Sequence, residues 1–235
     1  VQRRNGVAMI LDSYYWRKEL SRMMDELVSC FRFLAKHAYR LDRHPIFSRI
    51  VERKEYIAER DLLLSAFIVR TLFEAGKLSD EMADYELSIV SYPATPRNSN
   101  KLMPLLRRVP DDDLYDYDRP SQLSIPGRRF VNQLIHAAVS PCCDFGDTPR
   151  PAAVRVVSDR FAQECLYRCE LDVWVKFVRE VVHDEVNSIH ETWDKDKGKW
   201  KIDRSRKEGG PLSSYEDVLI EDNCSFDRVD SSIVE

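Results

Sequence analysis

The stretch Leu62–Phe73, with the sequence LLLSAFIVRTLF, is nearly all apolar. It forms the second half of a helix that we expect over residues 47–75, and the first half of that helix is charged. A helix that is apolar on most sides has to be buried, so this stretch predicts the centre of a helical core. Gly76 fits the end of the helix, because glycine adopts the left-handed conformation there at little cost.

The segment before this helix predicts a second long helix. Apolar residues recur at steps of three and four over residues 12–41, which indicates one apolar stripe. The stripe consists of Leu20, Met23, Met24, Leu27, Phe31, Leu34 and Ala38. A boundary is expected before Pro45, since the residue before a proline is pushed out of the helical region. Two long helices joined by a short turn are expected to pack antiparallel.

Prolines break the segment that follows residue 76. We expect a short helix from Ser79 to about Glu86, and then a Pro-rich loop over residues 91–127 with one helical turn near 102–107. The loop contains Pro93, Pro96, Pro104, Pro110, Pro120 and Pro126. Helical spacing returns over Ser124–Val139, where a proline fits the first turn because its missing N–H costs nothing.

The C-terminal part of the chain predicts strands. Residues 153–157 and 165–171 have strand patterns and are expected to form a hairpin. Residues 172–185 have helical spacing. Residues 188–193 and 199–203 alternate around a turn, which predicts a second hairpin.

The end of the chain is polar and acidic. Residues 208–235 contain eight acidic residues and one basic residue, whereas the whole chain has a formal charge of −4. The rest of the chain therefore carries a net charge of +3. We expect a weakly ordered tail and a mildly basic folded part, which permits an anionic partner.

Together these patterns predict an α+β fold that is mainly α. Its N-terminal part is expected to be a helical bundle with long antiparallel helices, and its C-terminal part to be small and to contain strands. In this division residues 1–150 form the helical domain with the Pro-rich loop, and residues 151–207 form a small α+β region with hairpins. Residues 208–235 form the acidic tail.

Composition excludes several classes of protein. No run approaches the roughly 18 apolar residues of a membrane span. The six cysteines are sparse, and the five histidines complete no zinc-ligand set. We therefore expect reduced thiols, no metal and no cofactor. No secretory signal is visible, which predicts a cytoplasmic protein.

The segment RRFVNQLIH, residues Arg128–His136, carries the candidate chemistry. On a helix Arg129, Asn132 and His136 fall within roughly 60° of arc and form one polar stripe. Arginine can hold a phosphate oxygen bidentately. Histidine can move protons near neutral pH, and asparagine can orient either group or a ribose. The stripe predicts a site that binds and cleaves a phosphodiester.

At these residues the chain resembles the HEPN superfamily of prokaryotic nucleases and nucleotide-binding helical domains. The mark of that family is an arginine, four to six residues and then a histidine, and six residues separate Arg129 from His136. The resemblance implies a metal-independent ribonuclease of a prokaryotic or phage defence or toxin–antitoxin system. It further implies a homodimer in which the ribose 2′-hydroxyl attacks the adjacent phosphate. It would make Arg129 the phosphate ligand, His136 the catalytic or positioning imidazole and Asn132 the polar helper. The family often has a polar residue directly after the arginine, where this chain has Phe130.

A non-catalytic function stays open beside this one. His136 could be a core histidine bonded to a backbone carbonyl, and Arg129 could pair with a loop aspartate such as Asp112 or Asp116. The chain would then be a helical interaction protein that binds a partner protein or nucleic acid.

The second predicted hairpin offers a nucleic-acid surface. Its cations could follow a phosphate backbone while its tryptophans stack on bases. Together with Arg128, the expected contact residues are Lys197, Lys199, Lys201 and Trp200. A charged, exposed hairpin without a ligand is the alternative. We therefore expect RNA, a second copy of the chain or a partner protein as partners, and no membrane.

Overall fold

The structure is a computed structural model that describes residues 13–37, 45–96, 114–137, 142–143, 152–158, 163–194 and 197–206. It confirms an α+β fold in which helices come first and strands dominate later in the chain. None of the helices in these ranges combines the length and the apolar composition that a membrane span requires.

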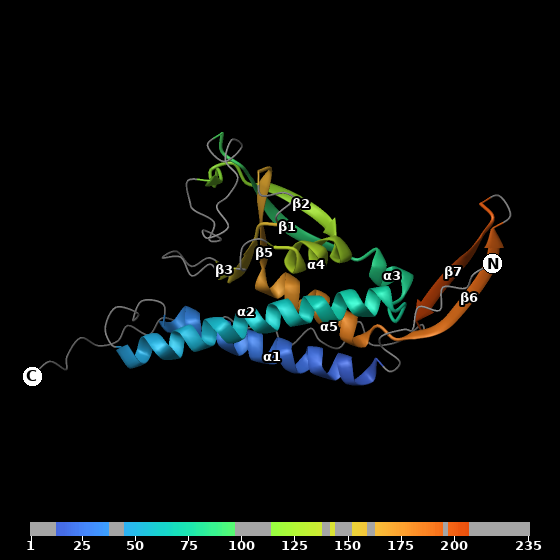
Figure 1. The fold of residues 1–235 in the computed structure, drawn as a ribbon, viewed down its shortest axis with the longest axis horizontal. Coiled ribbons are helices and arrows are strands. Elements are labelled where there is room, and N and C mark those ends of the chain that lie inside the picture. Colours follow the sequence, from blue (N-terminus) through green and yellow to red (C-terminus); the bar gives the residue numbers. More distant parts are fainter. Residues whose placement is uncertain are drawn as a thin grey trace, which may run out of the picture.

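Two long antiparallel helices form one side of the molecule, as the sequence predicts (Figure 1). They are α1 (Tyr14–His37) and α2 (Pro45–Glu74), and they pack along each other. α2 is followed by Gly76, which adopts a positive φ of 65°. The apolar half of α2 is less buried than its sequence suggests, because Leu64 and Phe67 are 44% and 49% exposed. Residues 38–41, the end of the predicted first helix, lie outside the described residues.

A five-stranded antiparallel sheet faces these helices, with the strand order β2-β1-β5-β4-β3. The strands are β1 (Glu86–Pro93), β2 (Ser121–Pro126), β3 (Cys142–Cys143), β4 (Ala153–Val156) and β5 (Cys165–Glu170). β4 and β5 pair as the predicted hairpin. The central strand β5 joins β4 to β1.

The predicted loop over residues 91–127 is wrong at both ends, since β1 and β2 occupy them. The prolines do not interrupt pairing, because Pro93 and Pro126 are the last residues of their strands. β2 also lies at the sheet edge, where proline is tolerated. Residues 97–113, with the predicted helical turn, lie outside the described residues. The proposed boundary at residue 150 falls within this sheet, because β1 pairs with β5 across it.

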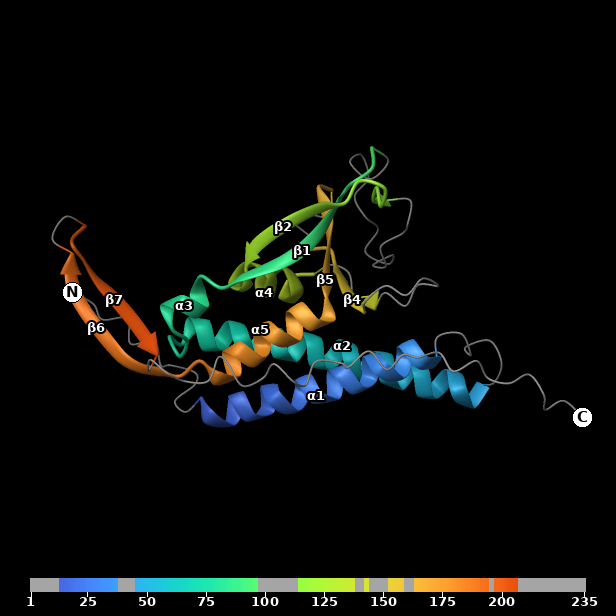
Figure 2. The same cartoon turned by 180° about the vertical axis from the view of Figure 1, so that it is seen from behind.

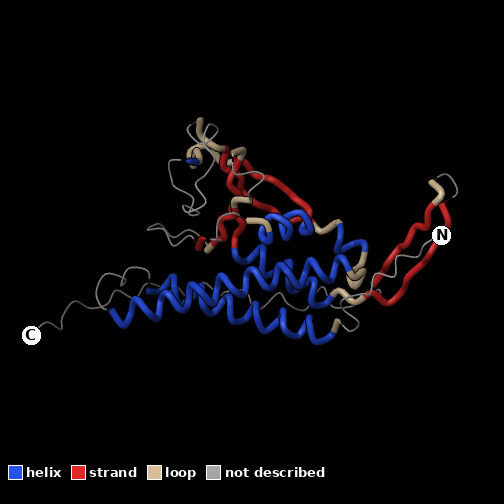
Figure 3. The backbone as a smooth tube through the Cα atoms, in the orientation of Figure 1, coloured by secondary structure: helices blue, strands red, loops and turns tan. Residues whose placement is uncertain are grey.

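Two shorter helices lie between the sheet and the long helices, which gives three layers (Figure 3). They are α4 (Gly127–Ile135) and α5 (Leu171–His183). The core at this junction contains Phe130, Trp174 and Phe177, all fully buried, with neighbouring ring centroids 5.6–5.8 Å apart. Gly127 permits the close approach, since a Cβ there would lie 2.4 Å from the Phe177 ring. The other sheet face carries a smaller buried cluster of Tyr92, Tyr115, Val157 and Leu166.

A buried polar junction fixes the ends of three helices. Ser79 caps the short helix α3 (Asp80–Ala83), and its N–H and hydroxyl both donate to Asp184 at 2.7 and 2.6 Å. Arg17, near the start of α1, donates to the carbonyl oxygens of Val181 and Lys77. The junction therefore ties the start of α1 and the start of α3 to the end of α5.

A two-stranded hairpin leaves the body from this junction (Figures 1 and 2). We call it the arm; it consists of β6 (Val186–Asp194) and β7 (Lys199–Arg206), and it confirms the second predicted hairpin. The Arg204 backbone N–H donates to Asp80 of α3 at 2.7 Å, which anchors the arm at its base. Gly198 takes a positive φ of 58° in the turn. The predicted tail over residues 208–235 lies outside the described residues.

Candidate functional site

The predicted stripe of Arg129, Asn132 and His136 lies on the solvent side of α4, and we call it the α4 polar face. Arg129 and His136 are exposed and Asn132 is half-buried. The opposite side of the same helix buries Phe130, Val131 and Leu134. The helix thus divides as the sequence predicts, with an apolar anchor on one side and polar groups on the other.

A further cation reaches this face from α2. The Arg70 guanidinium lies 3.2 Å from Nε2 of His136, and Glu74 holds the same guanidinium at 2.7 Å. Because a guanidinium only donates, Nε2 accepts in this contact and the ring proton sits on Nδ1. Sequence reasoning missed Arg70, although it is the single charged residue within the apolar stretch Leu62–Phe73.

The expectation that His136 is a core histidine bonded to a backbone carbonyl is wrong, because His136 is exposed and its ring meets Arg70. Of the aspartates suggested for Arg129, Asp116 forms an ion pair with Arg119 at 3.1 Å, and Asp112 lies outside the described residues. The charge of Arg129 acts on Tyr167 of β5. Burial raises the pKa of the Tyr167 hydroxyl to about 12, and Arg129 opposes this rise.

The α4 polar face can bind an anion but has no metal-binding geometry. Two guanidiniums and an imidazole offer several N–H donors on one accessible surface, which suits a phosphate. Within the described ranges, no three His, Cys, Asp or Glu side chains gather to hold a metal ion. Cys30, Cys165 and Cys169 are free thiols, and burial raises the pKa of Cys169 to about 12.

The arm presents a second candidate surface, which we call the arm apolar face. It consists of Ile189, Trp193, Trp200 and Ile202, which are 58%, 46%, 59% and 39% exposed. Trp193 and Trp200 are direct cross-strand partners, and their ring centroids are 5.3 Å apart. Residues directly opposite one another share a sheet face, and Ile202 and Trp200 alternate with Lys201, so these apolar side chains project to one side.

The cations predicted to bind nucleic acid are largely paired. Lys197 meets Asp194 at 3.7 Å, and Lys201 meets Asp203 at 2.9 Å, which raises the pKa of Lys201. The side chain of Lys199 lies outside the part of the molecule that the structure describes. Arg128 is exposed on α4, and α4 lies apart from the arm (Figure 1), so the predicted contact residues do not form one surface. The structure brings Trp200 and Lys201 onto one hairpin, yet on its opposite faces.

Comparison with known proteins adds no relative. The chain matches no model of a protein family, no curated protein and no solved structure.

Proposed function

We propose that this is an interaction protein whose arm apolar face binds an apolar surface of another protein chain. The carrying observation is that four large apolar side chains, each at least 39% exposed, gather on one face of a projecting hairpin. An isolated two-stranded hairpin is marginally stable in water, so this face adds little to folding. It is available to bind instead.

Energetics favour a protein as the partner. Fully burying one large apolar side chain stabilises a complex by about 1.5–3 kcal/mol. Aromatic residues such as tryptophan commonly contribute much of the binding free energy of an interface. Phosphate contacts, by contrast, need unpaired cations. Lys197 and Lys201 are paired with aspartates of the arm itself, and Lys201 points to the face opposite the apolar one. An apolar groove of a protein therefore fits the arm better than a nucleic-acid backbone.

Site-specific crosslinking tests this proposal. A photoreactive phenylalanine analogue replaces Ile202 in one variant and the adjacent Lys201 in a control, because neighbouring strand residues point to opposite faces. We expect crosslinks to another protein chain from position 202 and far fewer from position 201. The experiment is run on the purified protein, where the partner would be a second copy, and in cell extract. Equal crosslinking from both positions, or none from either, would overturn the proposal.

A second candidate function is metal-independent RNA cleavage at the α4 polar face. It is supported by the accessible placement of Arg129, Asn132 and His136 and by the arrival of Arg70 at His136. A phosphate oxygen would replace the imidazole as the partner of Arg70. Nε2 of His136 could then accept the proton of the 2′-hydroxyl as that oxygen attacks phosphorus.

Cleavage assays with EDTA present test this second candidate. His136→Ala and Arg129→Ala should each lower cleavage of mixed RNA by about 100-fold or more, in the range that general acid–base catalysis contributes. Arg119→Ala, at an exposed position outside α4, serves as the control. Equal cleavage by all variants, or none by the wild type, rules the activity out.

A further inference from the structure

A hollow of about 590 Å³ lies between the two long helices, toward the start of α2 and therefore at the opposite end of that helix from the arm. It is lined by Glu26 of α1 and by Arg49, Ile50, Arg53, Lys54 and Ile57 of α2. The α2 residues recur at steps of three and four, so they share one helix face. The volume lies within the range of small-ligand sites.

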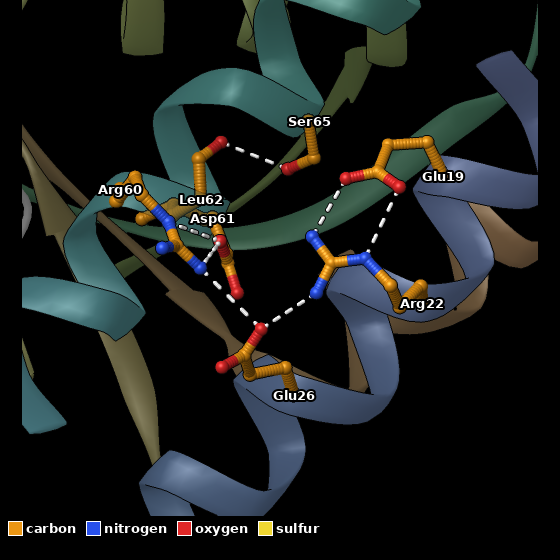
Figure 4. A network of polar contacts seen from close by, with 7 residues as sticks. All are labelled: Glu19, Arg22, Glu26, Arg60, Asp61, Leu62 and Ser65. Atoms are coloured by element: carbon orange, nitrogen blue, oxygen red, sulfur yellow. Dashed lines mark hydrogen bonds and ion pairs between the residues drawn. The ribbon is translucent and has the colours of Figure 1, made fainter.

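The charge of this hollow is positive. Among its described lining residues the one acid is Glu26, which is already engaged by Arg22 at 2.8 Å and Arg60 at 3.3 Å, neither of which lines the hollow (Figure 4). Within the part of the chain that the structure describes, Arg49 and Arg53 form no ion pair. The cations are therefore not neutralised by the one carboxylate beside them.

The remaining groups add an apolar component. The Lys54 ammonium lies 5.9 Å from the centre of the Phe33 ring, a cation–π contact, and Lys54 forms no ion pair with any residue that the structure describes. Ile57 is half-buried and Ile50 is 43% exposed, so both offer apolar surface next to the guanidiniums. Two arginines four residues apart can grip one phosphate group with several charge-assisted hydrogen bonds.

We propose that this hollow binds a phosphorylated small molecule that carries an apolar or aromatic group. The phosphate lies between Arg49 and Arg53, and the apolar group lies on Ile50 and Ile57. Lys54 contributes charge from the side. The hollow shares no residue with the arm apolar face or with the α4 polar face.

Titration with phenyl phosphate and with inorganic phosphate tests this proposal on the full chain at low ionic strength. Wild type should bind phenyl phosphate more tightly than inorganic phosphate. Arg49→Gln/Arg53→Gln should weaken phenyl phosphate binding by at least about 10-fold, because both guanidiniums that donate charge-assisted hydrogen bonds to the phosphate are lost. Ile50→Ser should keep phosphate binding and remove the preference for the phenyl ester.

The matched control is Arg119→Gln/Lys176→Gln, which removes the same charge from exposed positions outside the hollow. It should leave both affinities within about two-fold, since distant exposed charges are screened. Circular dichroism checks that all variants stay folded. Absence of phenyl phosphate binding to the wild type at millimolar concentration would overturn the proposal. An equal loss in the two double variants would do so as well, because it would show bulk charge attraction only.

Discussion

The body and the arm use large apolar residues in opposite ways. In the body, Trp174 and Phe177 are completely buried between the sheet and the helices. In the arm, Trp193 and Trp200 are about half exposed on a two-stranded ribbon that is anchored to α3 at its base. The same residue type thus stabilises the fold in one region and is left accessible in the other. This contrast indicates that the body holds the structure together and the arm is available for contact.

Removing one aromatic ring from each region should give the largest difference in the free energy of unfolding. Phe177→Ala removes a fully buried side chain and should lower the free energy of unfolding by about 3–5 kcal/mol. Trp200→Ala removes a side chain that is 59% exposed and should lower it by less than about 1 kcal/mol. Urea denaturation measures both. Similar losses would show that the arm belongs to the cooperative core.

Substitutions of two glycines, one in the body and one in the arm, should lower stability by intermediate amounts. Gly127→Ala would place a Cβ 2.4 Å from the Phe177 ring, so it should destabilise the body by about 1–3 kcal/mol. Gly198→Ala meets no atom within 4 Å, and its cost of about 1 kcal/mol comes from the positive φ alone. That cost should fall on the arm without changing the melting temperature of the body. In a Phe177→Leu background the Gly127→Ala penalty should shrink, and an unchanged penalty would mean that the ring is not its cause.

The smallest predicted effect is a difference between wild type and Asp61→Asn in how the free energy of unfolding depends on pH. Asp61 is fully buried, and its Oδ2 has no hydrogen-bond partner while Oδ1 meets Arg60 at 2.7 Å. Burial raises the pKa of Asp61, against the opposing charge of Arg60. The folded state therefore binds this proton more tightly than the unfolded state does. That contribution to stability is complete below the ordinary pKa near 3.9 and is lost as the pH rises through the raised value.

Measurements of the free energy of unfolding between about pH 4 and 7 check the direction of this pH dependence. The stability of Asp61→Asn should decline less with rising pH than that of the wild type. Asp203→Asn on the arm is the control, since its side chain is 45% exposed and pairs with Lys201. A decline in Asp61→Asn that equals the wild-type decline would contradict the assignment.

Periodicity predicts what is local in this fold and misses what is long-range. Both long helices, α5, the β4–β5 hairpin and the arm follow from spacing alone. β1 and β2 could not be predicted, because each ends at a proline and because strand pairing in this sheet joins distant parts of the chain. In β1, for example, Val90 pairs with Arg168 of β5. The candidate site divides in the same way. The stripe on α4 could be predicted because its residues lie within one short segment of the sequence. The contact between Arg70 and His136 could not, because these two residues are 66 positions apart in the chain.

Hydrogen exchange of individual amides, measured on monomeric protein, tests the central claim most directly. We predict that amides of β6 and β7 exchange through local opening that costs far less than global unfolding. Amides of the central strand β5 should exchange only at the cost of global unfolding. Arm amides as protected as those of β5 would contradict the account, because the arm would then be part of the core and its apolar face would not be reserved for a partner.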